Sequence, residues 1–180
     1  MPTIVNKESA ARRKEVRGFL EKIVLDAGVG RLSQTPNFEE KALVQVMRDL
    51  AAMTGQKAET RRAKKSIAGF KVRENQIVGL RITLRRDKMV DFFERLIRIV
   101  LPRVRDFGGL ETTNIDTHGV LNTGIREQAV FPEISPENSP VIFSFGITMV
   151  PRVKERAKAL AEFRRLGVPL KDDTKAKAKK

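Results

Sequence analysis

Residues 61–86 read RRAKKSIAGFKVRENQIVGLRITLRR, and two different patterns meet in this stretch. The first half, residues 61–73, carries six basic side chains and no acidic one. In the second half, residues 77–85, apolar and polar positions alternate, which is the pattern of a half-buried strand. The stretch therefore predicts a mobile basic loop that leads into a strand, whose outer face presents Arg81, Thr83 and Arg85.

A basic loop beside a strand with arginines on its outer face suggests a polyanion as partner, and RNA first. The composition agrees, because 36 basic residues stand against 22 acidic ones and the net charge is +14. The absence of cysteine excludes disulfides, thiol nucleophiles and thiolate metal sites. No apolar run approaches the length of a membrane span and no signal peptide opens the chain, which predicts a cytoplasmic protein without a membrane partner.

The remaining pattern predicts strands that alternate with amphipathic helices. We expect helices over residues 37–54, 87–102 and 154–166, with Asn37 and Asp87 as N-terminal caps and Gly55 directly after the first. Further strands are expected near residues 21–27, 57–62 and 141–150. Together they predict an α+β fold, a two-layer sandwich in which helices cover one face of a mainly antiparallel sheet and the other face stays open.

The charge distribution predicts three parts along the chain. Residues 1–20 are polar and basic and are expected to form an N-terminal arm, although a short helix is the alternative. Residues 21–169 should form a single α+β RNA-binding domain. Residues 170–180 are rich in lysine, have almost no core-forming side chains and should be a disordered tail.

The open face is suited to folded RNA. Its arginines can contact the backbone and the wide minor groove of an RNA helix through shape and 2′-hydroxyl groups. The aromatic side chains that stack on bases are absent from this face, which favours structured RNA over single strands. The residues expected to point outward are Lys22, Asp26, Arg81, Thr83, Arg85, Ser144 and Thr148.

Other functions have weaker support. Gly28 and Gly30 follow a strand, as in dinucleotide-binding folds, but the remaining motif residues do not fit and a tight turn with positive φ is the better interpretation. An RNA-processing or RNA-modifying enzyme is the alternative function, yet it would need a catalytic base, a metal cluster or a cofactor loop. The lone His118 is better explained as a loop residue, so no catalytic residue, metal or cofactor is predicted. A membrane-surface protein is weaker still, since the apolar helix stripes are needed for the core.

Seven runs along residues 21–134 resemble the signature of one protein family, that of the fifth large-subunit ribosomal protein, the carrier of 5S ribosomal RNA. The similarity extends over residues 21–169. The runs begin with EKIVLDAGVG at residues 21–30 and continue with TGQK (54–57), RAKKSIAGFK (62–71), FFERLI (92–97), PRVRDF (102–107), GIREQ (124–128) and FPEI (131–134).

The resemblance implies a structural protein of the central protuberance that binds 5S rRNA with its open sheet face. The positions that match the family's RNA-contacting residues are Asp26, Gln56, Thr83 and Arg85, to which the outward-facing Arg81 is added. The family's usual residue at position 26 is asparagine. Aspartate lacks the amide's donors and adds repulsion toward phosphates, so Asp26 is a departure from the family pattern.

The resemblance also implies partners for three loops. The basic loop corresponds to one that reaches P-site tRNA, and the loops at residues 112–122 and 135–140 lie where the family bridges to a head protein of the small subunit. Other large-subunit proteins of the 5S rRNA particle are implied as neighbours. The family's longer N-terminal helix is expected here only as the basic arm. The residues of the predicted tRNA-contacting loop are Arg62, Lys64, Lys65, Ser66, Gly69, Phe70, Lys71 and Arg73.

Overall fold

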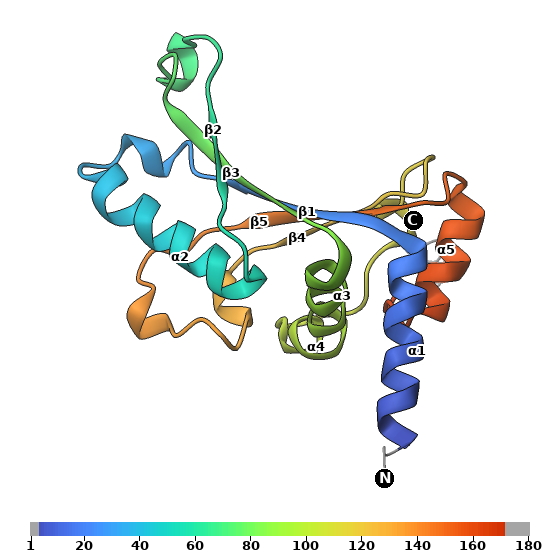
Figure 1. Cartoon of the computed structure of the whole chain (residues 1–180). Coiled ribbons are helices and arrows are strands. Elements are labelled where there is room, and N and C mark those ends of the chain that lie inside the picture. The colour runs from blue at the N-terminus through green and yellow to red at the C-terminus, as the bar shows by residue number, and fades with distance from the viewer. Residues whose placement is uncertain (1–3, 172–180) are drawn as a thin grey trace. The chain divides into compact units, whose positions relative to one another are not determined.

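The computed structural model describes residues 4–171, and their side chains from residue 10 onward. Five strands form one open antiparallel sheet in the order β2-β3-β1-β5-β4 (Figure 1). This confirms the expected α+β class. The strands are β1 (Leu20–Gly28), β2 (Glu59–Arg62), β3 (Ile77–Leu84), β4 (Leu121–Ile125) and β5 (Phe145–Pro151), and the α-helices are α1 (Ile4–Phe19), α2 (Leu43–Thr54), α3 (Arg86–Arg95), α4 (Leu101–Arg103) and α5 (Arg156–Arg165).

The chain divides into two compact units, and the division passes through several strands. Unit 1 comprises residues 1–23, 84–123 and 148–180, and unit 2 comprises residues 24–83 and 124–147. The single domain expected over residues 21–169 stays a prediction. Of the expected tail, residues 172–180 lie outside the described part, whereas Leu170 pairs with Leu110 in a parallel bridge and is therefore folded.

Unit 1 contains α1, α3, α4 and α5. The expectation of a basic N-terminal arm is wrong and its alternative, a helix, is what the structure has, because residues 4–19 form α1. Val16 on α1 is fully buried, and the Phe19 ring meets Phe163 of α5 edge-on with centroids 5.0 Å apart. An apolar anchor at the end of the segment thus holds a helix whose outer residues are mostly polar.

The predicted apolar stripe of the second helix lies in the core of unit 1. All of its members are buried: Met89, Phe92, Phe93, Leu96, Ile97, Val100 and Leu101. The expected cap is wrong, since α3 begins at Arg86 and Asp87 lies in its first turn. On α5 the buried residues are Ala159 and Phe163, whereas Ala157 and Ala161, whose spacing suggests an inward position, are exposed.

Unit 2 contains α2 and the β2–β3 hairpin. A π-helical turn, Phe38–Ala42, leads into α2. Asn37 has a left-handed backbone and no capping hydrogen bond, so the expected capping box does not form. Gly55 ends α2 with a φ of 66°, as expected, because glycine adopts this conformation without a Cβ clash. Neither Gly28 nor Gly30 has positive φ, so the predicted left-handed turn there is wrong.

The alternation of β3 places its side chains as predicted in its central part. Leu80 and Ile82 are about 1% exposed, while Arg81 between them is exposed. The pattern shifts at the start of the strand, where Ile77 is buried and Val78 is only half-buried. β3 pairs with β2 in antiparallel register, with an irregularity between Arg61 and Arg62.

Candidate nucleic-acid interface

An ion pair joins β1 and β3 on the exposed face of unit 2. Arg81 Nε donates to Asp26 Oδ1, and the two side chains are 43% and 44% exposed. Glu59 stands directly opposite Arg81 in the β2–β3 register. The hydrogen bond to Asp26 raises the pKa of Arg81, and the negative charges of Asp26 and Glu59 raise it further. Arg81 therefore points outward as predicted, but two acidic neighbours offset its charge.

Gln56 and Thr83 lie together in unit 2. The Gln56 side-chain amide donates to the Thr83 carbonyl oxygen over 3.2 Å, and both residues are half-buried. Thr54 holds the turn after α2, because its hydroxyl group donates to the Leu50 carbonyl over 2.7 Å and accepts from the Gln56 backbone N–H over 3.3 Å. Two residues that are 27 positions apart in the chain thus form one neutral polar cluster.

Arg85 belongs to unit 1, where it has an acidic neighbour. Its guanidinium lies 3.5 Å from Glu21 at the start of β1, and its side chain is 54% exposed. Like Arg81, it is accessible to a partner and also has an acidic neighbour. The expected outer face is therefore accessible, but its charge is more mixed than the arginines alone indicate.

The basic loop forms an extension of the β2–β3 hairpin that projects beyond α2 (Figure 1). Ile67 and Val72 exchange backbone hydrogen bonds of 2.9 and 3.2 Å around a short 3-10 turn, Ala68–Phe70. The Ser66 hydroxyl oxygen accepts from the Glu74 backbone N–H over 2.9 Å. The loop has internal order of this kind, and its expected mobility stays a prediction.

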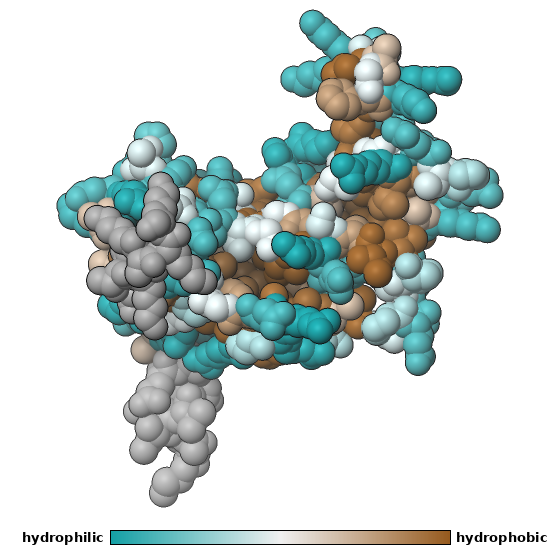
Figure 2. All heavy atoms as spheres, turned by 180° about the vertical axis from the view of Figure 1, so that it is seen from behind, coloured by the Kyte–Doolittle hydropathy of each residue, from teal (hydrophilic) through white to brown (hydrophobic). Residues whose placement is uncertain are grey.

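The tip of this hairpin combines cations with exposed apolar groups. Phe70 is 72% exposed and Ile67 is 50% exposed. Figure 2 shows hydrophilic side chains that radiate from the tip around a small hydrophobic cluster. Every predicted loop residue is exposed: Arg62, Lys64, Lys65, Ser66, Gly69, Phe70, Lys71 and Arg73.

The charges at the tip are available to an external anion. Lys64, Lys65, Lys71 and Arg73 make no ion pair with any residue in the described range 4–171. Arg62 differs, because its guanidinium donates to the Asn75 carbonyl oxygen over 2.9 Å. In chemical terms, the tip can contact phosphates through its lysines and stack one ring on an exposed base or ribose.

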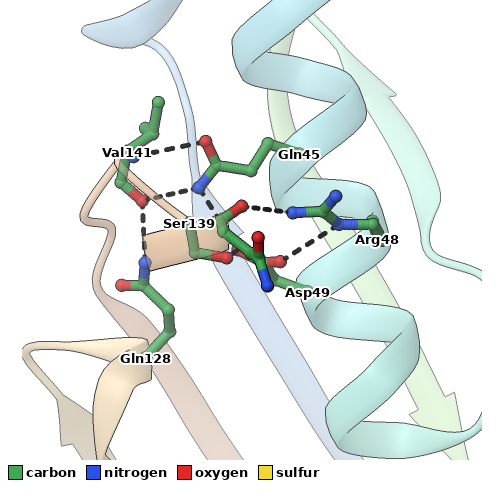
Figure 3. A network of polar contacts seen from close by, with 7 residues as sticks. Gln45, Arg48, Asp49, Gln128, Ser139 and Val141 are labelled. Atoms are coloured by element: carbon green, nitrogen blue, oxygen red, sulfur yellow. Dashed lines mark hydrogen bonds and ion pairs between the residues drawn. The ribbon is translucent and has the colours of Figure 1, made fainter. Parts of the chain in front are cut away.

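A polar network holds the loop at residues 135–140 against α2 (Figure 3). The Ser139 hydroxyl group donates to Asp49 Oδ2 over 2.7 Å, and both residues are buried. The Gln45 amide also reaches Asp49 Oδ2, at 3.3 Å. Sequence reasoning missed Asp49, since an acidic residue in a helical stripe has no signal that separates a buried position from a solvated one.

The same network continues into the chain that leads to β5. Gln45 and Val141 exchange hydrogen bonds of 3.1 and 3.2 Å, and the Gln128 amide donates to the Val141 carbonyl over 2.7 Å. Gln128 Oε1 accepts from the Phe143 N–H over 3.0 Å. Buried and half-buried side chains of the same unit therefore anchor the loop at residues 135–140.

Features that would support catalysis are few. His118 is exposed in a turn, where its backbone N–H donates to Asp116 Oδ1 over 2.8 Å. Within residues 4–171 no group of three or more metal-ligating side chains converges. Nor does any helix in that range have the length and apolar character needed to span a membrane.

Comparisons with known proteins agree on one family. The pattern described as "Ribosomal protein L5" matches residues 17–73, and the pattern for the C-terminus of the same ribosomal family matches residues 77–170. The protein is 44% identical to the large ribosomal subunit protein uL5 of Chlorobaculum tepidum over 152 residues, which are 84% of this chain and 81% of that protein. The uL5 of Rubrobacter xylanophilus is also 44% identical, over 84% of this chain and 82% of its own. The large ribosomal subunit protein uL5c of Gracilaria tenuistipitata var. liui is 42% identical, over 83% of this chain and 82% of its own.

Proposed function

Because the chain belongs to the ribosomal protein L5 family, a structural and non-enzymatic family of the large ribosomal subunit, we propose that it anchors 5S rRNA within that subunit. Family membership gives it a ribosomal, cytoplasmic location and rRNA as an associate. It also removes the alternative of an RNA-processing enzyme. The 5S rRNA assignment goes further and rests on particular residues.

The observation that carries this assignment is the polar cluster of unit 2. Gln56 and Thr83 are joined by a 3.2 Å hydrogen bond. In the same unit, Asp26 on β1 and Arg81 on β3 form an accessible ion pair. Neutral donors and acceptors of this kind suit the 2′-hydroxyl groups and base edges of an RNA minor groove. Arg85 of unit 1 adds an accessible cation to the proposed contact residues.

We assign the hairpin tip a separate partner, P-site tRNA. Its cations make no ion pairs with described residues, and its phenylalanine is largely exposed. A phosphate backbone and the flat faces at a tRNA elbow offer the matching chemistry. The loops at residues 112–122 and 135–140 are proposed to face a small-subunit head protein, and other proteins of the 5S rRNA particle to adjoin the chain.

The division of surfaces is tested with two variants in filter binding. Arg85→Ala should weaken 5S rRNA binding, because it removes an accessible cation from the proposed site. Lys64→Glu combined with Lys65→Glu should spare 5S rRNA binding and impair tRNA contact. If both variants weaken 5S rRNA binding equally, the two surfaces are not distinct. If the unaltered protein binds any RNA hairpin as tightly as 5S rRNA, the proposed function is wrong.

A further inference from the structure

A second basic site lies wholly within unit 1, and of its arginines only Arg85 belongs to the proposed 5S rRNA contact residues. Four arginines line one recess of about 390 Å³: Arg17, Arg85, Arg86 and Arg152. They come from the last turn of α1, the residue after β3, the first residue of α3 and the residue after β5. We propose that this recess binds a backbone phosphate of folded RNA.

Specific contacts bring these segments together. The Arg152 backbone N–H donates to the Phe19 carbonyl over 2.8 Å, which sets the end of β5 beside the start of β1. Arg17 reaches Asp87 on α3 over 3.2 Å. The convergence is therefore built by backbone pairing and by helix packing, and it depends on α1 being a helix that ends at this point.

Two of the arginines have acidic neighbours and two do not. Arg17 pairs with Asp87, and Arg85 lies 3.5 Å from Glu21, which also lines the recess. Arg86 and Arg152 are exposed and make no ion pair within residues 4–171. The recess thus keeps two positive charges that no described carboxylate offsets.

The apolar lining of the recess and the N-terminal end of α3 also favour the binding of an anion. Buried Leu20 and Met89 line the recess, so a bound group would lose part of its contact with water and its electrostatic interactions would strengthen. The α3 helix begins at Arg86, so the positive end of its dipole lies at a residue that lines the recess, and Asp87 in the first turn offsets part of it. Guanidinium groups bind phosphate oxygens in pairs of parallel hydrogen bonds, and a recess of this size accommodates a phosphate with its ribose.

The ligand is assigned as RNA because the chain is an rRNA-associated protein with a net charge of +14. This step rests on the proposed function, since 5S rRNA is the probe. The recess would add phosphate contacts, which fix the orientation of an RNA without reading its sequence. We therefore expect it to contribute to affinity and to salt dependence, and to leave the preference for 5S rRNA over other hairpins unchanged.

The test compares two double variants of the full chain that lose the same charge. Arg86→Ala with Arg152→Ala empties the recess of its unpaired cations, while Arg98→Ala with Arg105→Ala removes two exposed arginines of the same unit elsewhere. Thermal melting should show both variants folded, since none of the four side chains is buried. Filter binding to 5S rRNA across a series of salt concentrations is then the readout.

The recess variant should bind 5S rRNA about tenfold more weakly than the control variant, and its log–log salt slope should be shallower by about 0.9, the duplex value for one lost phosphate contact. Equal affinities for the two variants would overturn the inference while leaving 5S rRNA binding itself intact. Loss of inorganic phosphate binding without loss of RNA affinity would overturn the RNA assignment. Failure of the unaltered protein to prefer 5S rRNA would instead reject the proposed function.

Discussion

At the scale of single residues, the exposed face of unit 2 is less cationic than alternation alone suggests. Arg81 is outward, as predicted, yet Asp26 and Glu59 flank it on the neighbouring strands. A period of two residues identifies which side chains share a face, but it says nothing about which strand lies beside which. The acidic partners of Arg81 therefore could not be predicted without the strand order.

We predict that Asp26→Asn strengthens 5S rRNA binding. The change removes a negative charge next to the proposed RNA contact and frees the charge of Arg81. A screened Coulomb energy of about 1 kcal/mol corresponds to about a fivefold gain in affinity for 5S rRNA. Stability should change little, because an exposed ion pair contributes about 0–1 kcal/mol. Filter binding compares Asp26→Asn with the control Glu39→Gln, which removes the same charge at a position away from the Asp26–Arg81 pair. The comparison separates a local effect at the pair from the effect of the net charge. Weaker binding by Asp26→Asn would mean that the carboxylate itself contacts RNA.

At the scale of elements, the long amphipathic stretches were predicted well and their ends were not. The core stripes over α2 and α3 follow from helical spacing, because burial of several apolar residues outweighs local preferences. Asn37 and Asp87 have side chains suited to capping, but the chain enters both helices by other routes. The helix α1 was only the alternative to an arm, because what holds it lies far away in the sequence: Val16 and Phe19 are buried, and Arg13 pairs with Asp91 of α3.

We predict a measurable role for the buried network beneath the loop at residues 135–140. Ser139→Ala removes the 2.7 Å hydrogen bond to buried Asp49 and should lower the free energy of unfolding by about 1–3 kcal/mol, the cost of a partly unsatisfied buried group. Urea unfolding gives the value. Ser135→Ala, an exposed position of the same loop, should stay within about 0.5 kcal/mol of the unaltered protein. Equal losses for the two serines would contradict this role of the network.

At the scale of the whole molecule, the sequence predicted the class of partner and the α+β fold from net charge and alternation. The arginine recess of unit 1 could not be predicted, since its members lie at positions 17, 85, 86 and 152 and only folding collects them. The residues of the hairpin tip, in contrast, are contiguous in the chain. Contiguous surfaces can be recognised in a sequence, while surfaces assembled from distant segments need the structure.

We predict that two RNAs bind the protein at the same time. If the hairpin tip and the proposed 5S rRNA contact residues are separate surfaces, a tRNA should not displace labelled 5S rRNA from the protein at moderate salt. For about six charges of the loop near phosphates, counterion release of the single-strand kind gives tRNA binding a log–log salt slope of about −4. A gel shift with both RNAs should then show a ternary complex. Full mutual displacement would indicate one shared polyanion surface.

The backbone bonds between Ile67 and Val72 carry a consequence for how the tip meets its partner. A segment that is already folded back on itself has surrendered part of its conformational entropy during folding. Docking then forfeits less freedom, and more of the contact energy appears as affinity. The hairpin is in this sense preorganised, and it can engage a large RNA without first having to fold upon it.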